Sequence, residues 1–254
     1  MQSIIAGQNL KTMKQQQTAA KLSPLTILLL TFFAFQANAQ TKVQASDIMA
    51  AMKNGETINY SNVTVTGVLD FTYMDEKSPD LPRRRSWWSN MGDNTVNEVI
   101  EGKINFENVT FEDDVIAYFR NDRSEYTFTA DFEEDVTFKN CKFEKDAMFK
   151  YSEFERNTSF SGSIFKDETT FKYAEFTTLA DFSNTQFDED AIFKYTEFDS
   201  GVDFSSARFE RSLDIKYVKV RGDFSIKDLY VRWDIDSKYS SVNGKKFTKD
   251  MLNN

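Results

Sequence analysis

The residues with the clearest binding chemistry in this sequence are three consecutive arginines beside two tryptophans. They are Arg83, Arg84, Arg85, Trp87 and Trp88. Arginine guanidinium groups make paired hydrogen bonds to carboxylates and phosphates, and tryptophan rings offer flat area for stacking. The cluster is therefore a candidate binding site for an anionic or sugar-like group. The alternative, which we prefer, is that the tryptophans pin a loop to the body of the protein while the arginines neutralise its acidic surface.

Tyrosines that recur at a constant interval form the second candidate site. Tyr151, Tyr173 and Tyr195 each follow a lysine directly and precede a glutamate by two positions. If the chain makes one full turn over the interval from one tyrosine to the next, these side chains align in rows of lysine, tyrosine and glutamate. A tyrosine row would offer a flat surface to a protein or glycan partner. The alternative is that the tyrosines and the charged pairs only stabilise a sheet, and we favour it.

Clusters of acidic residues are a third place where chemistry could occur. They lie at Glu112–Asp114, Glu133–Asp135 and Asp188–Asp190. Carboxylates are the ligands that Ca²⁺ prefers, but the sequence contains neither an EF-hand loop nor a glycine–aspartate nonapeptide. We expect these clusters to be solvated turns, and we predict neither a metal site nor a cofactor.

Residue types that common forms of catalysis need are missing or single. The sequence has no histidine, which removes the commonest general base. Cys141 is the only cysteine, so no internal disulfide can form. Its place in the repeat described below predicts a small buried side chain rather than a nucleophile. We therefore expect a protein without enzymatic activity.

The N-terminal residues have the features of an export signal. Three lysines precede an apolar run at 25–35, which is followed by Ala37 and Ala39. Small residues at these two positions are typical of a signal-peptidase site, so cleavage is predicted after Ala39. We expect residues 1–39 to be a signal peptide and the mature protein to be periplasmic or extracellular, with no integral membrane span. The alternative is an uncleaved anchor.

The charge of the chain restricts its partners. It carries 40 acidic and 31 basic residues, which gives a net charge of −9. Binding to the phosphate backbone of a nucleic acid needs a basic surface. We therefore expect no nucleic acid partner.

Phenylalanine defines a repeat in the middle of the chain. From Phe138 to Phe209 the intervals between phenylalanines alternate between five and six residues, and a small or aliphatic residue stands two positions before each one. Residues two apart on an extended strand face the same side, so each short segment turns both residues inward. Four such segments, two of five residues and two of six, make one turn of 22 residues. This is also the interval from Tyr151 to Tyr173. Each ring then stacks on the ring one turn away.

This pattern resembles the pentapeptide-repeat family, and more narrowly its variant with alternating five- and six-residue segments. The resemblance is strongest over Val136–Ile215. It implies an all-β fold, a right-handed quadrilateral parallel β-helix. Some members of the family resemble DNA and inhibit DNA gyrase, and an export signal disfavours that role here because it removes the protein from such a target.

Both ends of such a solenoid need covering, because an open β-helix exposes its core and its sheet edges. Residues 40–56 are predicted to contain a capping helix that starts after an N-cap at Ser46 or Asp47. Residues 57–235 are predicted to form the solenoid. Residues 236–254 are predicted to form a C-terminal cap or tail, with a short helix near 247–252.

Two segments interrupt the repeat, an insertion at 72–103 and an irregular coil at 112–131. Insertions in solenoids often form the binding face. We expect an exported, non-enzymatic scaffold that binds a protein or an envelope polymer through these insertions, and that could form a homo-oligomer. Besides DNA mimicry, the alternative is a glycan-acting enzyme, which would need a cleft beside the insertion with a carboxylate at its base.

Overall fold

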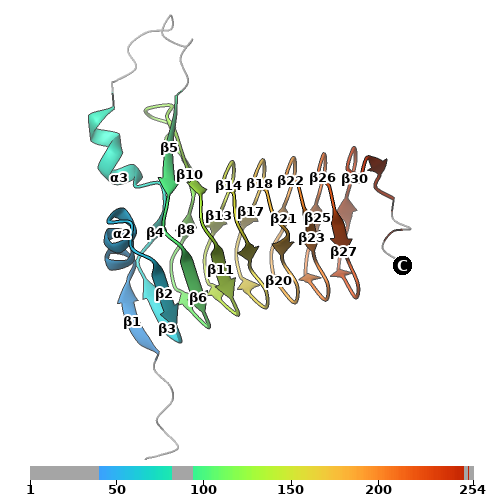
Figure 1. The fold of residues 1–254 in the computed structure, drawn as a ribbon, viewed down its shortest axis with the longest axis horizontal. Coiled ribbons are helices and arrows are strands. Elements are labelled where there is room, and N and C mark those ends of the chain that lie inside the picture. Colours follow the sequence, from blue (N-terminus) through green and yellow to red (C-terminus); the bar gives the residue numbers. More distant parts are fainter. Residues whose placement is uncertain (1–39, 82–93, 249–250, 252–254) are drawn as a thin grey trace, which may run out of the picture. The chain divides into compact units, whose positions relative to one another are not determined.

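The computed structural model describes residues 40–81, 94–248 and 251 of the 254-residue chain. These residues form seven stacked coils of four short strands each (Figure 1). The predicted signal peptide, residues 1–39, lies outside the described residues, and so does the cluster from Arg83 to Trp88. No helix in the described part of the chain is long and apolar enough to cross a membrane.

Equivalent strands of successive coils pair in parallel into four sheets, here named faces 1 to 4 in the order in which each coil passes through them. Face 1 contains β2 (Ile58–Ser61), β6 (Ile104–Glu107), β11 (Val136–Lys139), β15 (Thr158–Ser159), β19 (Ala180–Asp181), β23 (Gly201–Asp203) and β27 (Asp223–Ser225). Face 2 contains β1 (Thr41–Gln44), β3 (Val63–Thr66), β7 (Thr110–Phe111), β12 (Lys142–Phe143), β16 (Ile164–Phe165), β20 (Gln186–Phe187), β24 (Arg208–Phe209) and β28 (Tyr230–Val231).

Faces 3 and 4 complete each coil. Face 3 contains β4 (Leu69–Asp70), β8 (Val115–Ile116), β13 (Ala147–Met148), β17 (Thr169–Thr170), β21 (Ala191–Ile192), β25 (Leu213–Asp214) and β29 (Ile235–Asp236). Face 4 contains β5 (Thr95–Ile100), β10 (Thr127–Phe132), β14 (Glu153–Phe154), β18 (Glu175–Phe176), β22 (Glu197–Phe198), β26 (Lys219–Val220), β30 (Ser241–Val242) and β31 (Lys245–Lys246), with β9 (Tyr118–Arg120) beside β10. Only the pairs β9–β10 and β30–β31 are antiparallel among the described strands.

Phenylalanine rings fill the interior of the coils. Rings at equivalent positions of successive coils stack with centroids 4.5 Å to 5.4 Å apart, as in the pairs Phe143–Phe165 and Phe182–Phe204. Rings from neighbouring faces meet edge to face, as Phe160 meets Phe171 at 73°. Both arrangements are favourable for aromatic pairs. The prediction of a parallel β-helix with inward phenylalanines is confirmed.

The N-terminal end of the core is covered by a strand and a helix. Strand β1 extends face 2 beside β3, and helix α2 (Ala45–Lys53) follows it at once. The buried side chains of α2 are Ala45, Ile48 and Met52. The prediction of Ser46 or Asp47 as the N-cap is wrong, because the strand runs directly into the helix and Gln44 occupies that position without a side-chain cap.

The C-terminal end is closed by a hairpin. Strand β31 pairs with β30 on face 4, and Phe247, which is buried, meets the ring of Phe224 edge to face. Phe247 and Thr248 are not helical. Apart from Met251, the rest of the predicted final helix lies outside the described residues.

Both interruptions of the repeat lie in the turn from face 3 to face 4. The number of residues in one coil falls along the chain, as hydrogen bonds between equivalent positions of neighbouring coils show. The interval is 46 residues from Asn59 to Asn105, 32 from Lys103 to Asp135, and 22 from Asp135 to Asn157. The first insertion includes helices α3 (Met74–Lys77) and η1 (Ser78–Asp80). It is shorter than the predicted 72–103, because β5 already belongs to face 4. The irregular coil at 112–131 likewise contains β8, β9 and most of β10.

Candidate functional site

A row of stacked tyrosines follows the turn from face 3 to face 4, at the corner where both insertions leave the coils. We call it the tyrosine edge, and it consists of Tyr151, Tyr173, Tyr195, Tyr217 and Tyr239. Successive ring centroids lie 4.9 Å, 4.7 Å, 4.5 Å and 4.8 Å apart, and the planes differ by 4° to 18°. At the N-terminal end Tyr118 packs against Tyr151 in a tilted arrangement, so the row reaches the second insertion.

The structure brings together the three tyrosines that the sequence singled out and adds two more. Tyr217 and Tyr239 were missed, although each follows a lysine and continues the series at the same interval. The phenylalanine pattern becomes irregular after Phe209, so beyond it the pattern no longer indicates which polar residues align. That the row binds a partner stays a prediction.

The backbone of the tyrosine edge is unusual for this residue type. All five tyrosines have positive φ, between 59° and 64°. This left-handed conformation costs most residues about 1 kcal/mol or more, and asparagine and glycine tolerate it best. At the corner between faces 1 and 2, the equivalent positive-φ positions hold the expected types, among them Asn140, Gly162 and Asn184. Tyrosine is therefore placed five times where a smaller residue would be less strained.

The stacking determines what the tyrosine edge shows to solvent. Each inner ring has its two faces covered by its neighbours, so the surface consists of ring edges and hydroxyl groups. Tyr151 and Tyr173 remain 43% and 39% exposed. The row is therefore a line of ring edges and hydroxyl groups, and the use of this surface by a partner stays a prediction. Only Tyr239, at the end of the row, is 71% exposed.

Three lysines run along the tyrosine edge. In this lysine row, the Nζ atoms of Lys150, Lys172 and Lys194 lie 4.7 Å, 5.2 Å and 5.2 Å from the ring centroids of the tyrosines that follow them. Within the described part of the chain, none of the three has a carboxylate oxygen within 4.0 Å. Burial, and then the charges of Lys150 and Lys194, lower the pKa of Lys172. The charge of Asp214 offsets part of this effect at Lys172, and Lys150 donates a hydrogen bond to the Tyr118 hydroxyl at 3.2 Å. The row is thus a line of positive charge that, among the described residues, lacks a direct carboxylate contact.

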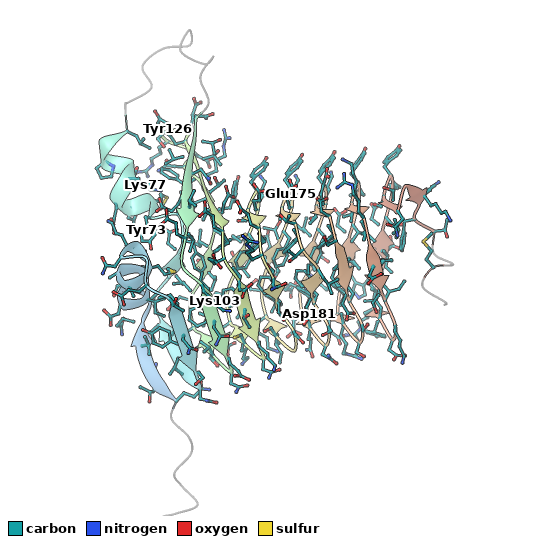
Figure 2. All side chains as sticks on the ribbon, in the orientation of Figure 1. Tyr73, Lys77, Lys103, Tyr126, Glu175 and Asp181 are labelled. Carbon is teal, nitrogen blue, oxygen red and sulfur yellow. The ribbon has the colours of Figure 1, made fainter. Side chains whose placement is uncertain are left out.

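Carboxylates form a row on the other side of the tyrosines. Glu153, Glu175 and Glu197 are in register on face 4, and we call them the glutamate row. Burial and neighbouring carboxylates raise the pKa of Glu153 and Glu175, whereas a hydrogen bond from Lys219 lowers that of Glu197. Figure 2 shows Glu175 on the same side of the coils as Tyr126 of the second insertion, and Asp181 of face 1 on the opposite side.

Cys141 and the acidic clusters are the other sequence candidates among the described residues. Cys141 is 1% exposed, and burial raises the pKa of its thiol to about 12, so it is not a thiolate nucleophile at neutral pH. Burial and then Asp167 and Asp114 raise the pKa of Asp146 where acidic turns stack. Among the described residues, no group of three or more acidic or cysteine side chains is arranged to hold a metal ion.

A glycan-acting enzyme would need a cleft beside the first insertion with a carboxylate at its base, and the structure has a depression there. Its lining includes Asp70, Tyr73 and Glu76. Both oxygens of Asp70 accept hydrogen bonds from the turn before α3, from the backbone N–H groups of Thr72 and Met74 and from the Thr72 hydroxyl. Burial and nearby carboxylates raise the pKa of Tyr73 well above its usual value. Asp70 therefore stabilises the backbone of the turn before α3.

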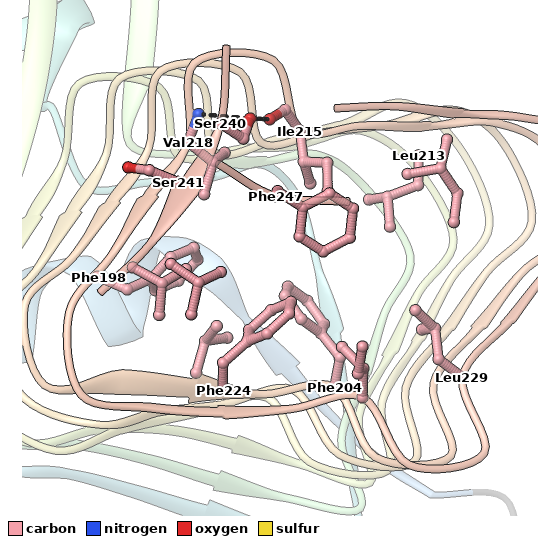
Figure 3. A pocket seen from close by; sticks show the side chains of 15 residues that line it. Phe198, Phe204, Leu213, Ile215, Val218, Phe224, Leu229, Ser240, Ser241 and Phe247 are labelled. Carbon is pink, nitrogen blue, oxygen red and sulfur yellow. Dashed lines mark hydrogen bonds between the residues drawn. The ribbon is translucent and has the colours of Figure 1, made fainter. Parts of the chain in front are cut away.

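The last coils enclose a small apolar cavity (Figure 3). It measures about 20 Å³ and lies where valine and isoleucine replace phenylalanine, as at Val220 and Ile215. The hydroxyl of Ser240, which faces it, donates to the Ile215 carbonyl and accepts from the Val218 N–H. A void of this size and polarity is a packing defect closed by Phe247 and is too small for an organic ligand.

Comparison with known proteins agrees with the geometry of the coils. Residues 128–175 and 171–219 match the family model described as pentapeptide repeats (9 copies). No match was found among the curated proteins or among the solved structures. The matched residues run from β10 to β26, where the regular coils with inward phenylalanines lie. Residues 128–219 therefore carry pentapeptide repeats, and these repeats form the regular coils of the β-helix.

Proposed function

We propose that this pentapeptide-repeat protein is an exported, non-enzymatic scaffold that binds a protein or a cell-surface polymer along the tyrosine edge. Export rests on the signal-peptide features of residues 1–39. The location of the site rests on the corner between faces 3 and 4, which carries the tyrosine edge and both ends of each insertion. The predicted cluster from Arg83 to Trp88 belongs to the first of these insertions.

The observation that carries the proposal is the repeated use of tyrosine in a left-handed turn. Each tyrosine costs about 1 kcal/mol or more in backbone strain, and each stacked pair returns about 0.5–1.5 kcal/mol. The two contributions nearly cancel, so stability alone gives little reason to keep tyrosine at five successive positions. An exposed, regularly spaced row of hydroxyl groups is suited to a partner that repeats along the same direction.

A role without catalysis is supported by the chemistry of the chain. Histidine is absent from the sequence, and the single cysteine is buried. Of the carboxylates beside the insertion, Asp70 accepts backbone hydrogen bonds and Glu76 forms an ion pair with Lys53. The uses that remain for the exposed rows are recognition and attachment.

Replacing the three predicted tyrosines by asparagine tests the proposal. In the variant Tyr151→Asn, Tyr173→Asn, Tyr195→Asn, we expect the free energy of unfolding to change by no more than about 2 kcal/mol, because relieved strain offsets lost stacking. We expect co-sedimentation of the mature protein with the envelope fraction of the producing cells to be lost.

A matched variant on the opposite corner serves as the control. Asn184→Gly and Ser206→Gly change exposed positions of positive φ between faces 1 and 2. This variant should sediment like the unaltered protein. Unchanged sedimentation of the triple asparagine variant would count against the tyrosine edge as the binding surface.

A further inference from the structure

We propose that the ligand of the tyrosine edge is a linear polysaccharide with a carboxylate on each sugar, lying along the stacking direction of the coils with its carboxylates on the lysine row. The inference rests on the proposed function, since it names the class of polymer that the same surface binds. Three features of the structure support it: the lysines without a carboxylate contact among the described residues, the interval between them, and the row of carboxylates on the other side of the tyrosines.

The lysine row lacks the partners that most neighbouring bases have. Elsewhere on the solenoid, cations pair with carboxylates in their own or the next coil, as Lys166 pairs with Asp188 at 2.6 Å and Lys219 with Glu197 at 2.6 Å. Lys216, the next lysine along the same corner, contacts both Asp214 and Asp236. Lys150, Lys172 and Lys194 have no carboxylate contact among the described residues, although the chain is strongly acidic. A line of mutually repelling cations is stabilised when anions bind to it.

The interval of the lysine row fits a polymer with one charge per sugar. Backbone N–H groups of Tyr151 and Tyr173 bond to the carbonyls of Lys172 and Lys194, so successive lysines are one strand spacing apart. That spacing is about 4.8 Å, which is comparable to the advance of one sugar along an extended chain. In a chain with a twofold screw, alternate sugars turn their carboxylates to the same side, so these carboxylates would meet alternate ammonium groups of the row. The tyrosine hydroxyls lie beside them and can bond to sugar hydroxyls.

The glutamate row limits how much charge the ligand can carry. Each strand of a DNA double helix has about one phosphate per 3.4 Å of helix axis, which is denser than the lysines and brings charge toward Glu153 and Glu175. Burial already disfavours the charged form of these two carboxylates. A polymer with its charge along one line, on the lysine side of the tyrosines, avoids that repulsion. The observations therefore favour a polyuronate over a nucleic acid.

Isothermal titration with matched oligosaccharides tests the inference. The probes are an α-1,4-linked galacturonate octamer and its full methyl ester, which has the same backbone without the charges. We expect the mature protein to bind the acid at least tenfold more tightly than the ester. In the variant Lys150→Gln, Lys172→Gln, Lys194→Gln, this preference should disappear.

A second lysine variant removes the same charge elsewhere. Lys139, Lys145 and Lys227 are exposed and lie away from the tyrosine edge, and their replacement by glutamine should change the affinity for the acid less than twofold. Equal binding of acid and ester would overturn the inference and leave the scaffold function intact. Absence of binding to the octamer, or equally tight binding of an octameric single-stranded DNA, would also overturn it. The sedimentation of the asparagine variant tests the proposed function independently.

Discussion

Replacing Phe171 by aspartate is expected to unfold the middle coils of the solenoid. The Phe171 side chain is 0% exposed and stacks between Phe149 at 5.2 Å and Phe193 at 5.0 Å. Loss of the ring alone costs about 3–5 kcal/mol, and an unpaired charge in its place adds several more. The sum is comparable to the total of roughly 5–15 kcal/mol that keeps a typical domain folded.

Urea unfolding followed by circular dichroism measures this effect. Because each coil contacts only its neighbours, the disrupted coils separate the solenoid into two weaker halves. Phe171→Leu is the matched apolar control and should cost about 1–3 kcal/mol while leaving a cooperative transition. Tyr173→Asp, two positions away on the exposed edge, should be tolerated. An unchanged transition for Phe171→Asp would contradict the inward position of this ring.

The change Gly201→Ala is expected to produce the second largest loss of stability, about 3 kcal/mol or more. Gly201 has a φ of 112°, which side chains rarely adopt, and starts β23 opposite Asp223 of the next coil. A Cβ atom at this position would lie 2.3 Å from the Asp223 carbonyl oxygen and 2.7 Å from its nitrogen. Both are backbone atoms of a paired strand, so the coils must separate to make room.

The variant Gly55→Ala serves as a control that separates the two causes of the stability loss, steric overlap of the Cβ atom and strain of the left-handed backbone. Gly55 also has a positive φ, 72°, but a Cβ atom there would meet nothing within 4 Å. This control should lose only about 1 kcal/mol, the cost of the left-handed backbone. Thermal denaturation of both variants gives the comparison. Equal melting temperatures would show that the close approach of β23 and β27 is not maintained in solution.

The core of the solenoid could be predicted from the sequence because its rule is simple. A phenylalanine and a small residue two positions before it are both buried in every regular coil, as Phe165 and Ser163 are. Where other apolar residues take the place of phenylalanine, the boundaries were predicted less well. Strand β5 presents Ile100 to the core at the position where later coils have phenylalanine. It was therefore assigned to the insertion.

The candidate site could be predicted only in part, and for a physical reason. The constant length of the regular coils aligns Tyr151 with Tyr173, but it does not give the direction of a side chain at a turn. The left-handed backbone of these residues turns the rings face to face. As a result, the row offers edges and hydroxyl groups instead of flat faces. Whether a lysine of the row has a carboxylate partner depends on the positions of all nearby carboxylates, which only the structure shows.

Photo-crosslinking in the producing cells tests the central claim, the location of the binding surface, most directly. A benzophenone amino acid placed at Tyr173 sits within the tyrosine edge, and the same group at Asn184 sits on the corner between faces 1 and 2. After irradiation, we expect the protein labelled at position 173 to form a covalent adduct of higher mass, and the protein labelled at position 184 to stay unchanged. An adduct from position 184 and none from position 173 would contradict the claim.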